Sequence, residues 1–73
     1  MTPTIFERAE AAYHNFIPIE TVGYEMRRNL DAKFIHMCNH LEDGNPVTAE
    51  QYAGSVLTLC ALFGAIEGEG VLQ

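Results

Sequence analysis

The sequence predicts an all-α fold: a small three-helix bundle with an apolar connection after the first helix and a flexible acidic C-terminal tail. Three observations predict it. The chain has 73 residues, of which 48% are apolar, so it can bury one small core and form one domain over residues 1–73. Apolar residues recur three or four positions apart over three stretches. Pro and Gly separate these stretches, and short loops would bring the helices together around one core.

The first helix is expected over residues 4–14. Thr4 and Glu7 have the spacing of a capping box, in which each side chain accepts the backbone N–H of the other residue. The following apolar residues recur at helical spacing: Ile5, Phe6, Ala9, Ala12, Tyr13 and Phe16. Pro18 disfavours helical geometry just before it, so residues 16–20 are expected to form a connection. Its apolar side chains are expected to fold back onto the core: Phe16, Ile17 and Ile19.

The second helix is expected over residues 21–42, with Thr21 as its N-cap. Its apolar stripe steps by three or four residues and is the clearest periodicity in the chain: Met26, Leu30, Phe34, Met37 and Leu41. The helix is expected to end near Glu42, because Gly44 can adopt a left-handed conformation and Pro46 follows just beyond it.

The third helix is expected over residues 48–66, where Thr48 and Gln51 repeat the capping-box spacing. Its stripe contains Tyr52, Val56, Leu57 or Leu59, Cys60, Phe63 and Ile66. The second half of this helix is apolar on nearly all sides, so it is either buried all round or docks onto a partner, which includes a second copy of the chain. Three glycines would fray its end and leave residues 67–73 as the tail: Gly64, Gly68 and Gly70.

Charge and length exclude several classes of function. Ten Asp and Glu against four Lys and Arg give a formal charge of -6, which repels the phosphate backbone and argues against autonomous DNA binding. The charge instead favours encounter with a basic protein surface. The N-terminal residues lack the pattern of a signal peptide. The longest apolar run, residues 56–66, is shorter than the roughly 20 residues that span a bilayer. We expect a cytoplasmic monomer without membrane contact.

No residue pattern indicates catalysis, a metal or a cofactor, so we expect a protein that is not an enzyme. His36 and His40 have the i, i+4 spacing of two metal ligands, but no third ligand completes a zinc motif. The spacing of Cys38 and Cys60 matches no zinc ribbon, which needs a second ligand about two to four residues from each, and we expect them to pack as free thiols. The acid pairs Glu7 with Glu10 and Glu67 with Glu69 are typical of a helix surface and of a tail.

Three of the four basic residues lie within one seven-residue window, and residues 34–73 contain none. These residues, Arg27, Arg28 and Lys33, predict a small cationic ridge on an anionic body. One interpretation is a solvated face that pairs with Glu25 and Asp31. The other is a local contact to RNA or DNA that a larger partner already holds.

Apolar residues also lie away from the main stripe of the second helix, where Tyr24, Ile35 and Cys38 form a second apolar side. Either the first helix and the connection cover this side, or part of it is a docking surface. Aromatic and aliphatic anchors carry much of the binding energy of protein interfaces. We therefore take Phe6, Tyr13, Tyr24 and Ile35 as candidate anchors. The candidate steering charges are Glu7, Glu10, Glu67 and Glu69.

In its length, acidity, helical character and the segregation of Arg27, Arg28 and Lys33, the chain resembles small phage-encoded transcription regulators that bind host RNA polymerase. The resemblance implies binding at the β′ subunit, near the RNA exit channel and the β flap. It implies inhibition of initiation by displacement of the σ factor, and antitermination aided by a host Nus factor. An alternative with the same physics is an acidic inhibitor of a host defence or nuclease complex that occupies its nucleic-acid channel.

Overall fold

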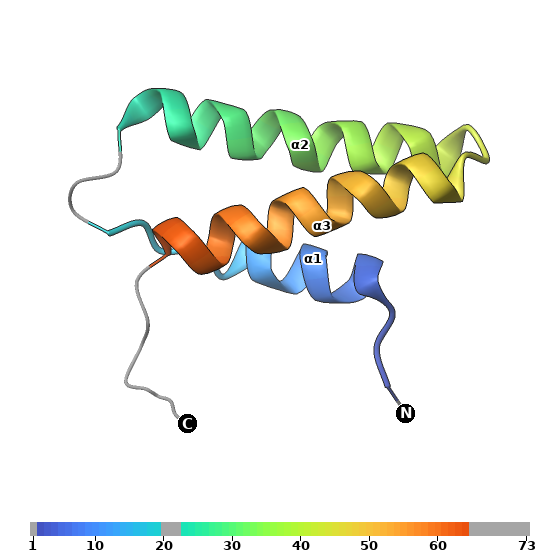
Figure 1. Ribbon diagram of the computed structural model, residues 1–73, viewed down its shortest axis with the longest axis horizontal. Coiled ribbons are helices and arrows are strands. Elements are labelled where there is room, and N and C mark those ends of the chain that lie inside the picture. The colour runs from blue at the N-terminus through green and yellow to red at the C-terminus, as the bar shows by residue number, and fades with distance from the viewer. Residues whose placement is uncertain (1, 20–22, 65–73) are drawn as a thin grey trace.

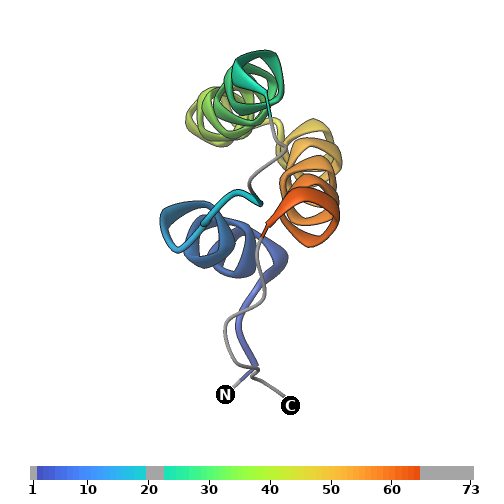
Figure 2. The same cartoon turned by 90° about the vertical axis from the view of Figure 1, so that its left-hand side faces the viewer.

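The computed structural model describes residues 2–19 and 23–64. Within them the chain forms the expected all-α three-helix bundle, with α1 at Ile5–His14, α2 at Tyr24–Glu42 and α3 at Pro46–Phe63. Helix α2 runs antiparallel to α1 and α3 (Figure 1). Viewed end-on, the three helices occupy the corners of a triangle, and α3 packs against both of the others (Figure 2). The predicted C-terminal tail lies outside the described residues.

The start of α1 confirms the predicted capping box. The Thr4 hydroxyl accepts the backbone N–H of Glu7 at 3.1 Å, and the Thr4 N–H donates to Glu7 Oε1 at 2.8 Å. At the other end, both the backbone N–H and the side-chain amide of Asn15 donate to the Ala11 carbonyl, at 3.0 and 2.9 Å. The last carbonyl groups of a helix have no hydrogen-bond partner within the helix, and these bonds supply one for Ala11. The helix thus ends one turn before Pro18.

The predicted N-cap of α2, Thr21, lies outside the described residues. The helix begins at Tyr24, and Gly23 occupies the N-cap position without a side-chain hydrogen bond. The end at Glu42 is confirmed, since Gly44 adopts a φ of 78° and the Asn45 N–H returns to the His40 carbonyl at 2.8 Å. Glycine adopts this left-handed backbone conformation at little cost in free energy, and the conformation ends the helix.

The boundaries predicted for α3 are wrong at both ends. The helix starts at Pro46, two residues before Thr48, so Thr48 and Gln51 make no capping box. Proline fits the first helical position because the N–H that it lacks has no partner there. At the other end, the helix stops at Phe63 instead of Ile66, and Gly64 is extended. Extended backbone at Gly64 pairs with Pro18, and the Ile19 N–H donates to the Phe63 carbonyl at 3.0 Å.

Small side chains dominate the core. The fully buried apolar residues come from all three helices: Ala9, Leu30, Met37, Ala49, Ala53 and Val56. The alanines of α3 let the other helices approach closely, and larger side chains close the edges, among them Phe16, Phe34 and Tyr52. The predicted core positions Leu30 and Met37 are therefore confirmed.

Three residues expected in the core are exposed instead: Leu41 by 39%, Ile17 by 48% and Ile19 by 39%. Leu41 lies in the last turn of α2, and α2 shares only a small interface with α1, so its side chain is not fully covered. Ile17 and Ile19 are two positions apart in extended backbone, so their side chains point to the same side, away from the core. Of the connection's described residues, 16–19, Phe16 is the one that packs on the core.

Among the described residues, no helix combines the length and the apolar character needed to cross a membrane.

Candidate functional site

A cluster of aromatic and charged side chains joins α1 to α2. The Tyr13 ring stacks on Phe34 with a centroid distance of 4.1 Å and an interplanar angle of 6°. The Tyr13 hydroxyl donates to Asp31 at 2.6 Å, and this bond raises the pKa of Tyr13, because the phenolate could not donate it. Arg27 Nε pairs with the same carboxylate at 3.2 Å, and its guanidinium lies 5.5 Å from the ring centres of Tyr13 and Phe16.

Two of the candidate partner-binding residues, Tyr13 and Arg27, thus make their main contacts inside the molecule. Both are partly buried, and both hold α1 and the connection against α2. The ion pair between Arg27 and Asp31 agrees with one of the two interpretations of the cationic ridge, in which the ridge pairs with Glu25 and Asp31. The bond from Tyr13 to Asp31 joins residues 18 positions apart and has no sequence signal. A role for either residue in binding a partner stays a prediction.

The second apolar side of α2 is covered only in part. Cys38 packs against the core, which agrees with the interpretation that other parts of the chain cover this side of α2. Tyr24 and Ile35 are exposed by 76% and 55%, as a docking surface requires. The Arg28 guanidinium lies 5.8 Å from the Tyr24 ring, which gives that exposed aromatic a cationic neighbour. Tyr24, Arg28 and Ile35 are therefore the candidate residues of α2 that remain accessible.

A groove between α1 and α2 brings three of the candidate residues together. Its volume is about 260 Å³. We define the α1/α2 groove by its lining residues: Phe6, Glu7, Glu10, Phe34, Met37, Cys38 and Leu41. Sequence reasoning named the α1 side. On the α2 side it placed Cys38 on the second apolar side of the helix, but it assigned Phe34, Met37 and Leu41 to the core stripe. The exposed position of Leu41 is the structural sign that this stripe is not fully covered.

The thiol in this groove is poorly suited to nucleophilic catalysis. Burial raises the pKa of Cys38, and the negative charges of Glu10 and Glu42 raise it further. Burial also raises the pKa of Cys60, on α3. A higher pKa keeps a thiol protonated, and the thiolate is the reactive form. Both cysteines are free.

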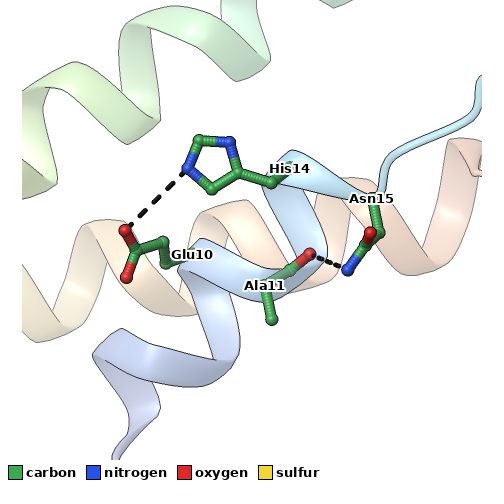
Figure 3. A network of polar contacts seen from close by, with 4 residues as sticks. All are labelled: Glu10, Ala11, His14 and Asn15. Atoms are coloured by element: carbon green, nitrogen blue, oxygen red, sulfur yellow. Dashed lines mark hydrogen bonds and ion pairs between the residues drawn. The ribbon is translucent and has the colours of Figure 1, made fainter.

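Figure 3 shows the side of α1 that faces α2, where Glu10 and His14 lie one turn apart. Their closest approach, Glu10 Oε2 to His14 Nε2, is 3.9 Å, and both side chains are mostly exposed. This pair is long and solvated, so it contributes little to stability. The carboxylate of Glu10 is therefore available to another cation.

The opposite side of α2 carries a second aromatic cluster, around Tyr52 of α3. The ring of His40 stacks on Tyr52 at 5.5 Å, His36 lies 5.2 Å from the same ring, and Lys33 Nζ lies 5.7 Å from it. His40 Nδ1 is buried and has no hydrogen-bond partner among the described residues. In the same part of the chain, no group of three or more His, Cys, Asp or Glu could hold a metal ion.

The three cations of the predicted ridge lie over different rings. Arg27 contacts the α1 side, Arg28 lies by Tyr24, and Lys33 lies over Tyr52 on the α3 side. Lys33 also borders a shallow depression of about 470 Å³ between α2 and α3. The other lining residues of this depression are Asn29, Gln51, Gly54, Ser55, Thr58 and Leu59. The predicted steering charges Glu67 and Glu69 lie outside the described residues.

Comparison with models of known protein families, with curated protein sequences and with solved structures gave no match. The resemblance to phage regulators of RNA polymerase therefore stays a prediction. The function of the chain is therefore inferred from its surface. The main features of that surface are acidic side chains, exposed apolar residues and the α1/α2 groove.

Proposed function

We propose that the chain is a phage-type transcription regulator without enzymatic activity, which binds host RNA polymerase at the β′ and β subunits near the RNA exit channel. In this proposal it inhibits initiation by displacing the σ factor, and it promotes antitermination during elongation. A bound regulator needs only a higher affinity for the σ-free enzyme to shift the population toward that state.

The observation that carries the proposal is the imbalance of charge on the accessible surface. The exposed acids among the described residues are Glu7, Glu10, Glu25, Glu42, Asp43 and Glu50. Against them stand only two exposed basic residues in the same part of the chain, Arg8 and Arg28. A surface of this kind is steered toward basic protein surfaces, and those that guide nucleic acid through a polymerase are basic.

Exposed apolar side chains supply the second support. Tyr24 and Ile35 lie on the outer side of α2 and are mostly exposed. Burial of an aromatic and an aliphatic anchor in a partner gives affinity that charge alone does not, because charge mainly sets the rate and the orientation of encounter. The proposal therefore assigns steering to the acids and affinity to these anchors.

Capture from bacterial lysate, read by mass spectrometry, tests the proposal. The bait is the chain, and the test variant replaces Glu10, Glu25, Glu42 and Glu50 by Gln, which removes four negative charges from exposed positions. The control variant replaces the same residues by Asp and keeps every charge. We expect the chain and the control to recover β and β′ with depleted σ, and the Gln variant to recover much less of both.

Two results would contradict the proposal. Recovery of only nuclease or defence-complex subunits would favour the alternative, an acidic inhibitor that competes with nucleic acid for a channel. Equal recovery of β and β′ by the Gln and Asp variants would show that charge does not drive the binding.

A further inference from the structure

We propose that the α1/α2 groove is a docking site for a basic amphipathic helix of a partner protein. One large apolar side chain of that helix enters the groove, and Lys or Arg residues beside it pair with the acidic residues of the lining, Glu7 and Glu10. The inference goes beyond the proposed function, since it names the site and the chemistry of the segment that it recognises.

Most of the residues that line the groove are apolar. Phe6 comes from α1, and Phe34, Met37 and Leu41 come from α2. Met37 is buried in the core, so Phe6, Phe34 and Leu41 supply the accessible apolar surface of the groove. A volume of about 260 Å³ is small for a drug-sized ligand. It is suited instead to an anchoring side chain such as Leu, Met or Phe.

The rim of the groove is acidic, and none of its lining residues is basic. Glu7 uses one carboxylate oxygen to accept the Thr4 N–H. The Glu10 side chain is 62% exposed, and His14 is 3.9 Å away (Figure 3). The charge of Glu42 is close enough to raise the pKa of Cys38 in the groove wall. An apolar floor with carboxylates at its rim complements a helix that carries apolar residues on one face and cations beside them.

The charge pattern excludes the two other candidate occupants. Residues 65–73 of the chain contain Glu67 and Glu69 and no Lys or Arg, so their charge is repelled by the rim. A second copy of the chain brings a formal charge of -6 to the same acidic surface. Like charges placed opposite each other in an interface oppose binding. The groove therefore selects a basic segment of a different protein.

Fluorescence anisotropy with two synthetic peptides tests the site on the purified chain. The first is an amphipathic helix with Leu at i, i+3, i+4 and i+7 and Lys at the flanking positions. The second has Glu in place of every Lys. We expect the Lys peptide to bind and the Glu peptide to bind at least about tenfold more weakly, because two or more attractive pairs become repulsive.

A pair of charge reversals locates the binding. Glu10→Lys changes the rim of the groove, and Glu50→Lys makes the same change at an exposed position of α3 outside the lining. We expect Glu10→Lys to weaken binding of the Lys peptide about fivefold and Glu50→Lys by less than about twofold. Circular dichroism checks that both variants keep the helical content of the chain.

Alkylation of the unaltered chain gives a second readout. Cys38 lines the groove and Cys60 does not, so peptide mapping reports occupancy at one cysteine and supplies an internal control at the other. We expect the Lys peptide to slow alkylation of Cys38 at least about threefold and to leave Cys60 unchanged.

Equal losses for Glu10→Lys and Glu50→Lys, or alkylation of Cys38 that the peptide leaves unchanged, would overturn the site. Failure of the proposed function gives a different result. If the peptide binds as expected and lysate capture recovers no polymerase, the groove stands and its partner is another protein with a basic helix.

Discussion

At the scale of single residues, Tyr13 connects the two helices that have the smallest shared interface. Its ring covers Phe34, and its hydroxyl reaches Asp31, which also accepts Arg27. One carboxylate therefore receives a phenol and a guanidinium at the same time. Only the neutral phenol can donate a hydrogen bond to the Asp31 carboxylate, so this contact favours the protonated form and raises the pKa of Tyr13.

Tyr13→Phe is expected to change the alkaline stability of the chain. The folded pKa of Tyr13 lies above the unfolded one, so the stability gained from its protonated form is complete below about pH 10. It is lost as the pH rises through the folded pKa. Urea unfolding at about pH 7 and about pH 10.5 measures this. The parent chain should lose more stability than the Phe variant between the two pH values; equal losses would contradict the assignment.

Arg27→Ala is expected to destabilise the chain by about 1 kcal/mol, since it removes a partly buried ion pair and contacts with two aromatic rings. Arg28→Ala is the matched control, because it removes the same charge from the next residue, which lies over the exposed Tyr24. Its effect should be close to zero. Equal effects in thermal unfolding would show that the contacts of Arg27 do not stabilise the fold.

At the scale of helices, the glycine inside α3 and the glycine at its C-cap should respond oppositely to replacement by alanine. A Cβ at Gly54, inside α3, meets no atom within 4 Å, whereas a Cβ at Gly64 lies 2.5 Å from the Cys60 carbonyl oxygen. Gly54→Ala should stabilise the chain by about 0.5–1 kcal/mol through helix propensity. Gly64→Ala should destabilise it by about 2 kcal/mol through overpacking. Urea unfolding of both variants checks the signs, and a shared sign would contradict this account of α3.

Helix boundaries were predictable where local side-chain chemistry determines them. The capping box of Thr4 and the left-handed Gly44 are short-range patterns, and both are confirmed. The start of α3 was not predicted correctly, because two sequence signals compete there. Pro46 favours a helix that begins at residue 46, whereas the spacing of Thr48 and Gln51 favours a later start, and the proline signal prevails. The end of α3 depends on the pairing of Gly64 with Pro18, which is 46 positions away in sequence and has no local signal.

At the scale of the whole molecule, the groove follows from the way the helices pack. Helices α1 and α2 both pack against α3 and share only a small interface with each other, so the stripe of α2 is partly left uncovered. Sequence reasoning named Phe6, Glu7 and Glu10 for the surface. It assigned Met37 to the core correctly, but it also assigned Phe34 and Leu41 wholly to the core. Periodicity shows which residues share a face and not how far a neighbouring helix covers that face.

The central claim is that this acidic bundle binds RNA polymerase in competition with σ, and a titration of purified bacterial core polymerase tests it most directly. The labelled chain is first bound to core enzyme, and σ is then added while anisotropy reports the bound fraction. If the chain and σ compete, we expect σ to release the chain from the polymerase. We also expect the midpoint of this release to move to higher σ concentration as more chain is supplied. A bound fraction that stays constant as σ saturates the enzyme would contradict it, as would the absence of binding to core polymerase.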